Sequence, residues 1–378
     1  MHLILCSEDS EAELRAELAQ SFASAPILAA HPLLLETDFE IVPGRRLPHL
    51  AFARQWLPNA QSVRAESIRA WAGIVLDAVV GMLPDDRPWS LHIEPHCGAR
   101  ITHRIGARAW HSASRHGVAS GQRSAVDQPP IPDTEAGRHR CEFIREALIE
   151  LLQKKRRHLR RQLRPEPVHA TVDDSLVQLL LTAPDAGFLS VAAAPVPFEQ
   201  RHLLSPFPKG ELPVASDKAA PSRAFSKLVE AELRLGRAIK AGETCADLGA
   251  SPGSWTYVAV GRGAQVIAVD RSPLREDLMR SRRVEFRPGD AFRFQPPRLV
   301  DWLLCDVIAA PERTAELLLE WLRRGWCRHF VVTVKLKDAS VAEVLALLKR
   351  ELPPLTGELF LSRLCANKKE ICAFGSAR

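Results

Sequence analysis

The sequence has no apolar run that approaches the roughly 20 residues needed for a membrane-spanning helix. Residues 1–6 lack the basic segment and the long apolar stretch of a secretory signal peptide. None of the eight cysteines forms a C-x-x-C pair, and several lie in apolar stretches, where cysteine behaves as a small hydrophobic residue. These absences predict a cytoplasmic protein with reduced thiols and no membrane partner.

A fixed-period internal repeat is also missing, which argues against a solenoid. The chain of 378 residues is long enough for two or three domains, and its 46% hydrophobic and 25% charged residues are typical of a globular protein. The formal net charge of +6 is a modest excess. A polyanionic partner must therefore be argued from where the cations lie.

The N-terminal half has the pattern of a mixed α/β structure. Apolar alternation and periodicity predict strands at 2–6, 32–40 and 89–95, helices at 10–22 and 65–82, and three later strands at 168–172, 176–182 and 188–193. Residues 50–57 close the first module. A proline-rich connector follows at 195–222, and the catalytic unit starts with a helix at 222–235.

Residues 104–140 are rich in Arg, Ser, Gly, Pro and His and have almost no apolar periodicity, which predicts a long loop. Its arginines could contact phosphate, and a solvated insertion explains them equally well. The histidines nearby, such as His92 and His96, match no standard zinc spacing. We therefore predict no metal site.

Residues 141–163 have apolar side chains at helical spacing, and the second half of this predicted helix is strongly basic. So many cations exceed what a helix C-terminus needs. We favour an RNA phosphate-binding face over a merely solvated face. The predicted RNA-binding residues are Lys154, Lys155, Arg156, Arg157, Arg160 and Arg161.

Residues 244–260 predict a buried strand, a glycine turn and a helix, and a second buried strand ends on Asp270 about 20 residues after the turn. At that place a doubly wound sheet carries the carboxylate that binds ribose hydroxyls. The turn reads D-x-G-x-x-x-G and contains Pro252, which has no N–H, so it suits a pyrophosphate poorly. An ordinary sheet-to-helix turn remains the alternative.

S-adenosylmethionine has no phosphate, and its carboxylate and ammonium need a helix N-terminus and nearby acceptors. Asp270 would bind the ribose of this cofactor, and Asp290, in PGDA at 288–291, its adenine amino group. The full set of predicted cofactor-binding residues is Asp247, Gly249, Ser251, Pro252, Gly253, Ser254, Trp255, Asp270, Asp290 and Asp306.

Further buried strands are predicted to end on Asp306 and Lys335, with helices at 311–324 and 341–351 and a hairpin formed by 355–364 and 369–374. Because the carboxyl ends of parallel strands share one edge, we expect Asp270, Asp306 and Lys335 to converge there. Lys335 could act as a base if a neighbouring cation, Lys227, lowered its pKa toward ~7–8. Asp306 and Glu370 would orient the two amines.

Several motifs now resemble a known family. FSKLVEA at 225–231, DLGASPGSW at 247–255, CD at 305–306, VKLK at 334–337 and KKE at 368–370 look like the catalytic tetrad and cofactor motif of FtsJ-like ribose 2′-O-methyltransferases. A wider likeness to the bacterial group that modifies a cytidine of 23S rRNA rests on FARQW at 52–56, SPF at 205–207, APSR at 220–223, GSWTY at 253–257 and WLRRGWCR at 321–328.

The resemblance implies an α/β chain with a ferredoxin-like module at 1–60, a THUMP-like RNA-binding domain at 61–197, a linker at 198–221 and a Rossmann-like methyltransferase domain at 222–378. It implies S-adenosylmethionine as cofactor and 23S rRNA or a large-subunit precursor as partner. By position, the catalytic tetrad is Lys227, Asp306, Lys335 and Glu370. The sequence departs from the family at Ser254, where the motif has a second glycine, and matches it poorly over 98–140.

Two further functions compete with an RNA ribose methyltransferase. One is an RNA-binding ribosome-assembly factor that has lost catalysis, which the intact tetrad opposes. The other is a nucleotide-dependent oxidoreductase, which the missing G-x-G-x-x-G pattern opposes.

Overall fold

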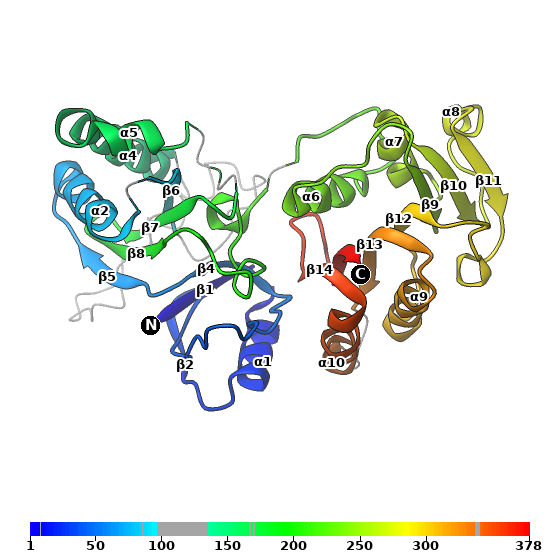
Figure 1. Ribbon diagram of the computed structural model, residues 1–378, viewed down its shortest axis with the longest axis horizontal. Helices are drawn as coiled ribbons and strands as arrows, with labels where there is room; N and C mark the ends of the chain where they lie inside the picture. Colours follow the sequence, from blue (N-terminus) through cyan, green and yellow to red (C-terminus); the bar gives the residue numbers. More distant parts are fainter. Residues whose placement is uncertain are drawn as a thin grey trace, which may run out of the picture. The chain divides into compact units, whose positions relative to one another are not determined.

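The computed structural model describes the chain except residues 8, 85, 97–134, 166–167, 169–170, 213 and 337–340. Most of the loop predicted at 104–140 lies outside the described residues, whereas residues 135–140 belong to a helix. The chain divides into two compact units, here called unit 1 (1–47 and 52–210) and unit 2 (48–51 and 211–378). Figure 1 shows the helices and strands of both.

Unit 1 begins with a small antiparallel sheet of strand order β2-β3-β1-β4. A helix joins the first two strands, as in a split β-α-β ferredoxin-like module. The strand predicted at 32–40 is present but shorter, at Leu34–Thr37, and the sequence patterns missed the strand Ile27–His31 before it. A two-residue turn with Leu33 at a φ of 61° joins the two strands in a hairpin. The elements are β1 (His2–Cys6), α1 (Glu11–Ser21), β2 (Ile27–His31), β3 (Leu34–Thr37) and β4 (Ala53–Leu57).

The second sheet of unit 1 has the order β5-β8-β7-β6, with β6 parallel to β7. The strand predicted near Val168 is absent at the described positions, where Thr171 and Asp174 instead form a turn with an Asp174 N to Thr171 O hydrogen bond of 3.1 Å. The elements are β5 (Gln61–Arg64), α2 (Ile68–Met82), β6 (Trp89–Pro95), β7 (Ser175–Ala183) and β8 (Ala186–Ala192).

The predicted basic helix is two helices, α4 (Glu135–Lys155) and α5 (Arg157–Gln162). Arg156, at φ −147° and ψ 63°, interrupts the helical backbone between them. The predicted apolar face is confirmed, because Ile144, Leu148 and Leu152 are fully buried in the core beneath α2 and α4. The break means that the cations before and after Arg156 do not share one helical face.

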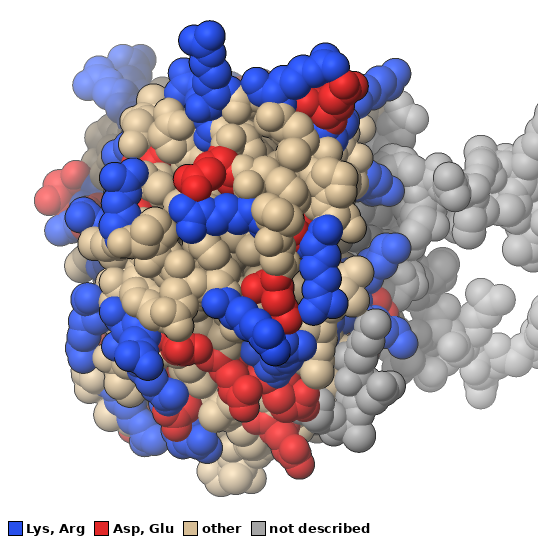
Figure 2. All heavy atoms as spheres, turned by 90° about the vertical axis from the view of Figure 1, so that its right-hand side faces the viewer, with Lys and Arg blue, Asp and Glu red and all other residues tan. Residues whose placement is uncertain are grey.

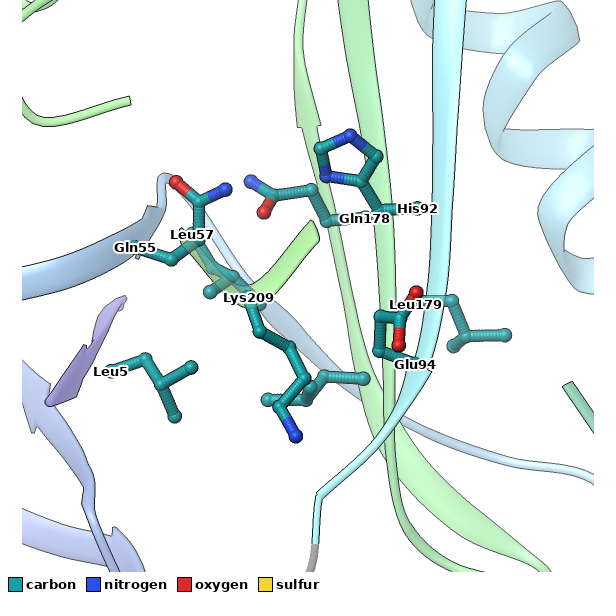
Figure 3. Close-up of a pocket in the computed structure, with 9 residues that line it drawn as sticks. Leu5, Gln55, Leu57, His92, Glu94, Gln178, Leu179 and Lys209 are labelled. Carbon is teal, nitrogen blue, oxygen red and sulfur yellow. The ribbon is translucent and has the colours of Figure 1, made fainter. Parts of the chain in front are cut away.

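A small cavity, partly open to solvent, lies between the two sheets of unit 1. Figure 3 shows side chains from β1, β4, β6 and β7 around it. Gln178 donates to the carbonyl of Trp56 at 3.0 Å, and Gln55 donates to the carbonyls of Ser205 and Phe207. These amides join strands and chain segments, so we interpret the cavity as part of the structural joint of unit 1.

Unit 2 contains a seven-stranded sheet of order β11-β10-β9-β12-β13-β15-β14. The strands from β11 to β13 are parallel, and β15 lies antiparallel between β13 and β14. The strands are β9 (Thr244–Leu248), β10 (Gln265–Asp270), β11 (Val284–Pro288), β12 (Val300–Cys305), β13 (Cys327–Lys335), β14 (Thr356–Ser362) and β15 (Glu370–Ala377). This confirms the predicted Rossmann-like sheet.

Helices cover both faces of this sheet, with α6 and α7 on one face and α9 and α10 on the other (Figure 1). The sheet centre is apolar and fully buried at Cys245, Trp302 and Phe374, which holds the strand ends at fixed positions. The helices are α6 (Phe225–Leu235), α7 (Ser254–Gly261), α8 (Glu276–Met279), α9 (Pro311–Arg323) and α10 (Val341–Glu351).

Candidate active site

The carboxyl ends of the parallel strands bring three predicted site residues to one edge of the sheet. Asp270 is the last residue of β10, Asp306 directly follows β12, and Lys335 is the last residue of β13. The chain winds from β9 toward β10 and β11, and later from β12 toward β13. The gap between β9 and β12 is therefore the topological switch point, where open α/β sheets bind ligands.

Two glycines make the turn after β9 possible. Gly249 and Gly253 have φ values of 73° and 108°, which favour glycine. A Cβ on Gly253 would lie 2.3 Å from a methyl carbon of Leu278, and one on Gly249 would lie 3.0 Å from the Cα of Val307. The backbone of this turn therefore passes so close to its neighbours that neither position has room for a side chain.

Other residues of the turn connect it to neighbouring segments. The Ser251 hydroxyl donates to the carbonyl of Pro273 at 3.0 Å, and the Trp255 indole N–H donates to the carbonyl of Ala224 at 2.9 Å. Ser254, which replaces the second glycine of the motif, is buried, and its Oγ lies 2.7 Å from Ser222 Oγ. Ser254 and Trp255 thus fasten the start of α7 to the segment before α6.

Asp270 links the first two strand ends. Its Oδ2 accepts the backbone N–H of Ser251 at 3.0 Å, and its Oδ1 accepts that of Ser272 at 2.9 Å. Each oxygen of a carboxylate can accept more than one hydrogen bond. Asp270 therefore retains acceptor capacity toward a ligand in the switch point.

Asp247 lies in the core, with only 2% of its surface exposed. Its Oδ2 accepts the hydroxyl of Thr256 at 2.6 Å, which ties β9 to the first turn of α7. Burial raises the pKa of Asp247 to about 7, although the hydrogen bonds from Thr256 lower it. Asp247 therefore lies beneath the turn, where it connects β9 to α7.

Asp290 follows β11 and already has several partners. Its Oδ1 accepts the N–H of Phe292 at 3.0 Å, and its Oδ2 lies 3.0 Å from Arg271 and 3.6 Å from Arg313. The Phe292 hydrogen bond and then Arg271 hold the pKa of Asp290 below its ordinary value.

Figure 2 shows Lys and Arg interspersed with Asp and Glu on the face of unit 2 turned toward the viewer.

Four charged side chains form a closed cluster beside the turn, here called the four-charge cluster: Lys227, Asp306, Lys335 and Glu370. Lys227 Nζ lies 3.0 Å from Asp306 Oδ2 and 2.6 Å from Glu370 Oε1. Lys335 Nζ lies 2.6 Å from Asp306 Oδ1 and 2.5 Å from Glu370 Oε2. The predicted tetrad is thus brought together, although its members are up to 143 residues apart in the sequence, from 227 to 370.

Strand pairing explains part of this geometry. Lys335 and Glu370 are direct partners in the antiparallel ladder of β13 and β15, so their side chains share one face. Asp306 follows β12, which is the neighbour of β13, and Lys227 reaches the cluster from α6. Three members therefore come from adjacent strands and one from a helix.

The structure corrects the predicted effect of Lys227 on Lys335. Burial lowers the pKa of Lys335, but the charges and hydrogen bonds of Asp306 and Glu370 outweigh it and raise that pKa above its ordinary value. For Glu370, burial raises the pKa, while the hydrogen bonds from Lys227 and Lys335 bring it below its ordinary value. Lys335 is therefore an ammonium at neutral pH in this resting arrangement.

Sequence reasoning missed Glu230, a fully buried carboxylate on the same helix as Lys227. Both its oxygens accept the backbone N–H of Cys365, at 3.0 and 2.8 Å, and Oε1 lies 2.7 Å from Arg234. A signal was present, because a glutamate lies three residues after Lys227, a predicted site residue, on one helix. Its partner Cys365 is distant in sequence, so spacing did not reveal the contact.

Within the described part of the chain, no group of His, Cys, Asp and Glu is arranged to hold a metal ion. His92 lies in β6 as predicted, and Cys97 and the histidines at 103, 111 and 116 lie outside the described residues. The described helices also contain none that is both long and apolar enough to cross a membrane.

Residues 220–349 match the model of the FtsJ-like methyltransferase family. A protein of Alkalilimnicola ehrlichii named Ribosomal RNA large subunit methyltransferase M is 31% identical over 347 residues, which cover 88% of this chain and 82% of that protein. A protein of the same name from Thauera aminoaromatica is 32% identical over 270 residues, covering 68% of this chain and 70% of that protein. The chain belongs to the ribosomal RNA large subunit methyltransferase M family.

A solved methyltransferase structure from Burkholderia thailandensis, with S-adenosylhomocysteine bound, covers 42% of this chain and 79% of its own at 16% identity. Its TM-score of 0.32 is too low to bear on the fold. For this member of the ribosomal RNA large subunit methyltransferase M family, the FtsJ-like match is more specific. It includes Lys227, Asp306 and Lys335 and ends before Glu370.

In this member of the ribosomal RNA large subunit methyltransferase M family, the basic run lies in unit 1. Lys154 and Lys155 end α4, whereas Arg157 and Arg161 lie on α5. All four are exposed, as is Arg156 at the break, and Arg160 is half-buried. The described acidic partner of the run is Glu150, 3.7 Å from Lys154. An exposed cationic run with this little acidic compensation suits a polyanion.

Proposed function

We propose that this protein transfers a methyl group from S-adenosylmethionine to a ribose 2′-hydroxyl of large-subunit ribosomal RNA, with a cytidine of 23S rRNA or of its precursor as the substrate. The observation that carries the proposal is the four-charge cluster at the switch point of an FtsJ-like domain. A cluster of two amines and two carboxylates suits an acceptor that must lose a proton.

The residues at the switch point fit S-adenosylmethionine. Gly249 and Gly253 allow the left-handed, closely packed backbone of the turn, and the backbone at the start of α7 would offer N–H groups to the carboxylate of the cofactor. Asp270 retains acceptor capacity for the ribose hydroxyls. The backbone N–H of Gly289 donates to the carbonyl of Asp270, and Asp290 is the next residue. Asp290 would accept a hydrogen bond from the adenine amino group. The cofactor would supply an electrophilic methyl group on a positively charged sulfur.

Lys335 is the proposed general base. Its neutral amine takes the proton of the ribose 2′-hydroxyl as the oxygen forms a bond to the methyl carbon and the carbon–sulfur bond breaks. Lys335 must first lose its own proton, because Asp306 and Glu370 raise its pKa in the resting structure. A second positive charge close to the Lys335 amine would lower its pKa and so act against the effect of the two carboxylates. After the proton transfer, Asp306 and Glu370 stabilise the protonated amine of Lys335.

RNA binding would be shared between the two units. The cationic run from Lys154 to Arg161 supports phosphate binding by unit 1, in line with the predicted THUMP-like role of 61–197. Phosphate contacts position an RNA but carry little sequence information. The proposed run therefore contributes affinity, while the four-charge cluster selects the reacting hydroxyl.

The experiment is a map of ribose methylation in ribosomal RNA from a deletion strain and its parent. We expect one 2′-O-methyl group of 23S rRNA to be missing in the deletion strain. The wild-type gene should restore it, and a gene encoding Lys335→Ala should not. Identical maps in both strains, or a change in a methylated base, would overturn the proposed reaction. Restoration by Lys335→Ala would favour a non-catalytic assembly role.

A further inference from the structure

We propose that Glu230 is a positioning residue that places Lys227 in the four-charge cluster, an inference that rests on the proposed function. Lys227 is the one cluster member that comes from a helix, whereas Asp306, Lys335 and Glu370 come from three neighbouring strands. Glu230 lies on that helix three residues after Lys227, and residues at this spacing are neighbours on a helix surface. It is fully buried.

The carboxylate of Glu230 connects α6 to the turn that leads into Glu370. The backbone N–H of Cys365 donates to both oxygens of Glu230, at 3.0 and 2.8 Å. Asn367 of the same turn donates its side-chain N–H to the carbonyl of Glu370 at 3.2 Å. Glu230 therefore fixes the helix carrying Lys227 to the chain segment carrying Glu370, whose oxygen lies 2.6 Å from Lys227.

Stability alone is a poor reason for a carboxylate at this place. The helix α6 already packs on the sheet through Phe225, Leu228 and Ala231. A buried ion pair, here Glu230 with Arg234 at 2.7 Å, is often no more stabilising than apolar residues of similar size. Apolar packing holds a helix without specifying its exact axial position. The hydrogen bonds that Glu230 accepts from the Cys365 amide define the axial position of α6. The contacts of Lys227 with the cluster require that position.

The helix contains its own control. Glu232 is also buried, at 2% exposure, and it also accepts one backbone N–H, that of Ile239 at 2.9 Å, and contacts one arginine, Arg262, at 3.0 Å. Its amide partner lies just after α6, not in the turn before Glu370. Glu230→Met and Glu232→Met thus remove equivalent groups from one helix, and only the first removes the anchor to the cluster.

The first measurement does not need methyl transfer. Lys227 is 8% exposed, and the rate at which acetic anhydride acetylates it in the full chain, followed by mass spectrometry, reports how firmly its amine is held. We expect Glu230→Met to raise that rate roughly tenfold, as for the loss of one hydrogen bond to a charged group. Glu232→Met should leave it unchanged. Glu230→Gln keeps an acceptor oxygen for Cys365 and should restore most of the protection.

The second measurement is methyl transfer to rRNA lacking the modification, with calorimetry for S-adenosylmethionine. We expect Glu230→Met to lower kcat by roughly 10- to 100-fold, the cost of about 1 Å of misplacement, while the cofactor Kd stays within about twofold. Glu232→Met should keep kcat near the wild-type value. If Glu230→Met does not fold, Glu230→Gln is compared with Glu232→Gln, and smaller changes of the same sign are expected.

Equal effects of the paired substitutions on Lys227 acetylation or on kcat would show that Glu230 is merely structural and would overturn the proposal. Unchanged acetylation in Glu230→Met would overturn it as well. If the wild-type protein transfers no methyl group to RNA, the proposed function fails. The acetylation rates would still decide whether Glu230 positions Lys227, so the two failures are distinguishable.

Discussion

Lys227 and Lys335 contact the same two carboxylates, those of Asp306 and Glu370. Their Nζ atoms lie 3.0 and 2.6 Å from Asp306 and 2.6 and 2.5 Å from Glu370, respectively. Two positive and two negative charges cancel within the cluster. The repulsion between the lysines is therefore offset by the carboxylates, and the pKa of Lys335 rises rather than falls.

The first prediction follows from the raised pKa of Lys335. Below that pKa, the neutral fraction of the amine increases about tenfold per pH unit. We therefore expect log kcat to rise with a slope near one between about pH 7 and pH 9, without a plateau. The measurement is kcat under saturating cofactor and RNA across this range. A plateau starting near pH 7 would show that Lys335 is not the group that loses the proton.

The second prediction concerns the chemistry of the base itself. Lys335→Arg keeps the positive charge between Asp306 and Glu370, but a guanidinium does not act as a base at neutral pH. We expect it to be nearly as inactive as Lys335→Ala, with a loss of at least roughly 10²-fold in kcat. Cofactor affinity, measured by calorimetry, should remain within a few-fold. Near-normal methylation by Lys335→Arg would make Lys335 an electrostatic residue.

The third prediction tests Asp270 as the ribose ligand. Asp270→Ala should weaken S-adenosylmethionine binding by about 1.5–3 kcal/mol, the range for hydrogen bonds to a charged group. Asp277→Ala is a suitable control, because Asp277 is an exposed carboxylate of α8 paired with Arg275. Titration calorimetry compares both variants with the wild-type protein. Equal affinities for all three would remove Asp270 from the cofactor site.

The fourth prediction concerns the basic run. Replacing Lys154, Lys155, Arg156 and Arg157 with glutamine should weaken RNA binding and make log Kd less dependent on log salt concentration, by about 0.7–0.9 for each lost phosphate contact. Cofactor affinity should not change. Neutralising Arg280 and Arg287 is the control, since both are ion-paired with glutamates on unit 2. The idea fails if the salt dependence is the same in both variants.

The fifth prediction uses the buried carboxyl of Asp247. Its pKa is about 7 in the folded protein and 3.8 ordinarily, so folding takes up a proton between these values. The free energy of unfolding should therefore fall as pH rises from 4 to 7, by up to about 1.4 kcal/mol per pH unit from this group. Asp247→Asn does not titrate. The free energy of unfolding of this variant, relative to that of the wild-type protein, should therefore increase from pH 4.5 to pH 7. Urea unfolding of both proteins measures the difference, and an equal difference at the two pH values would contradict the prediction.

Sequence patterns predicted the strands and helices best where burial was continuous. β9, β12 and β13 are buried over most of their length, and each occurs where predicted. The patterns missed features that backbone geometry decided, namely the hairpin around Leu33 and the helix break at Arg156. A single residue with an unusual φ leaves the hydrophobic period intact, so periodicity does not report it.

The sequence by itself determined which side chains would reach the site. A lysine or a carboxylate at the end of a buried strand is brought to one edge by parallel pairing, so the sequence alone predicts that Asp270, Asp306 and Lys335 lie at this edge. The tertiary structure decided how these charges act on one another. The pKa of Lys335 depends on distances to Asp306 and Glu370, and the anchor from Glu230 to Cys365 joins residues 135 positions apart. Such distances arise from packing, which local sequence does not specify.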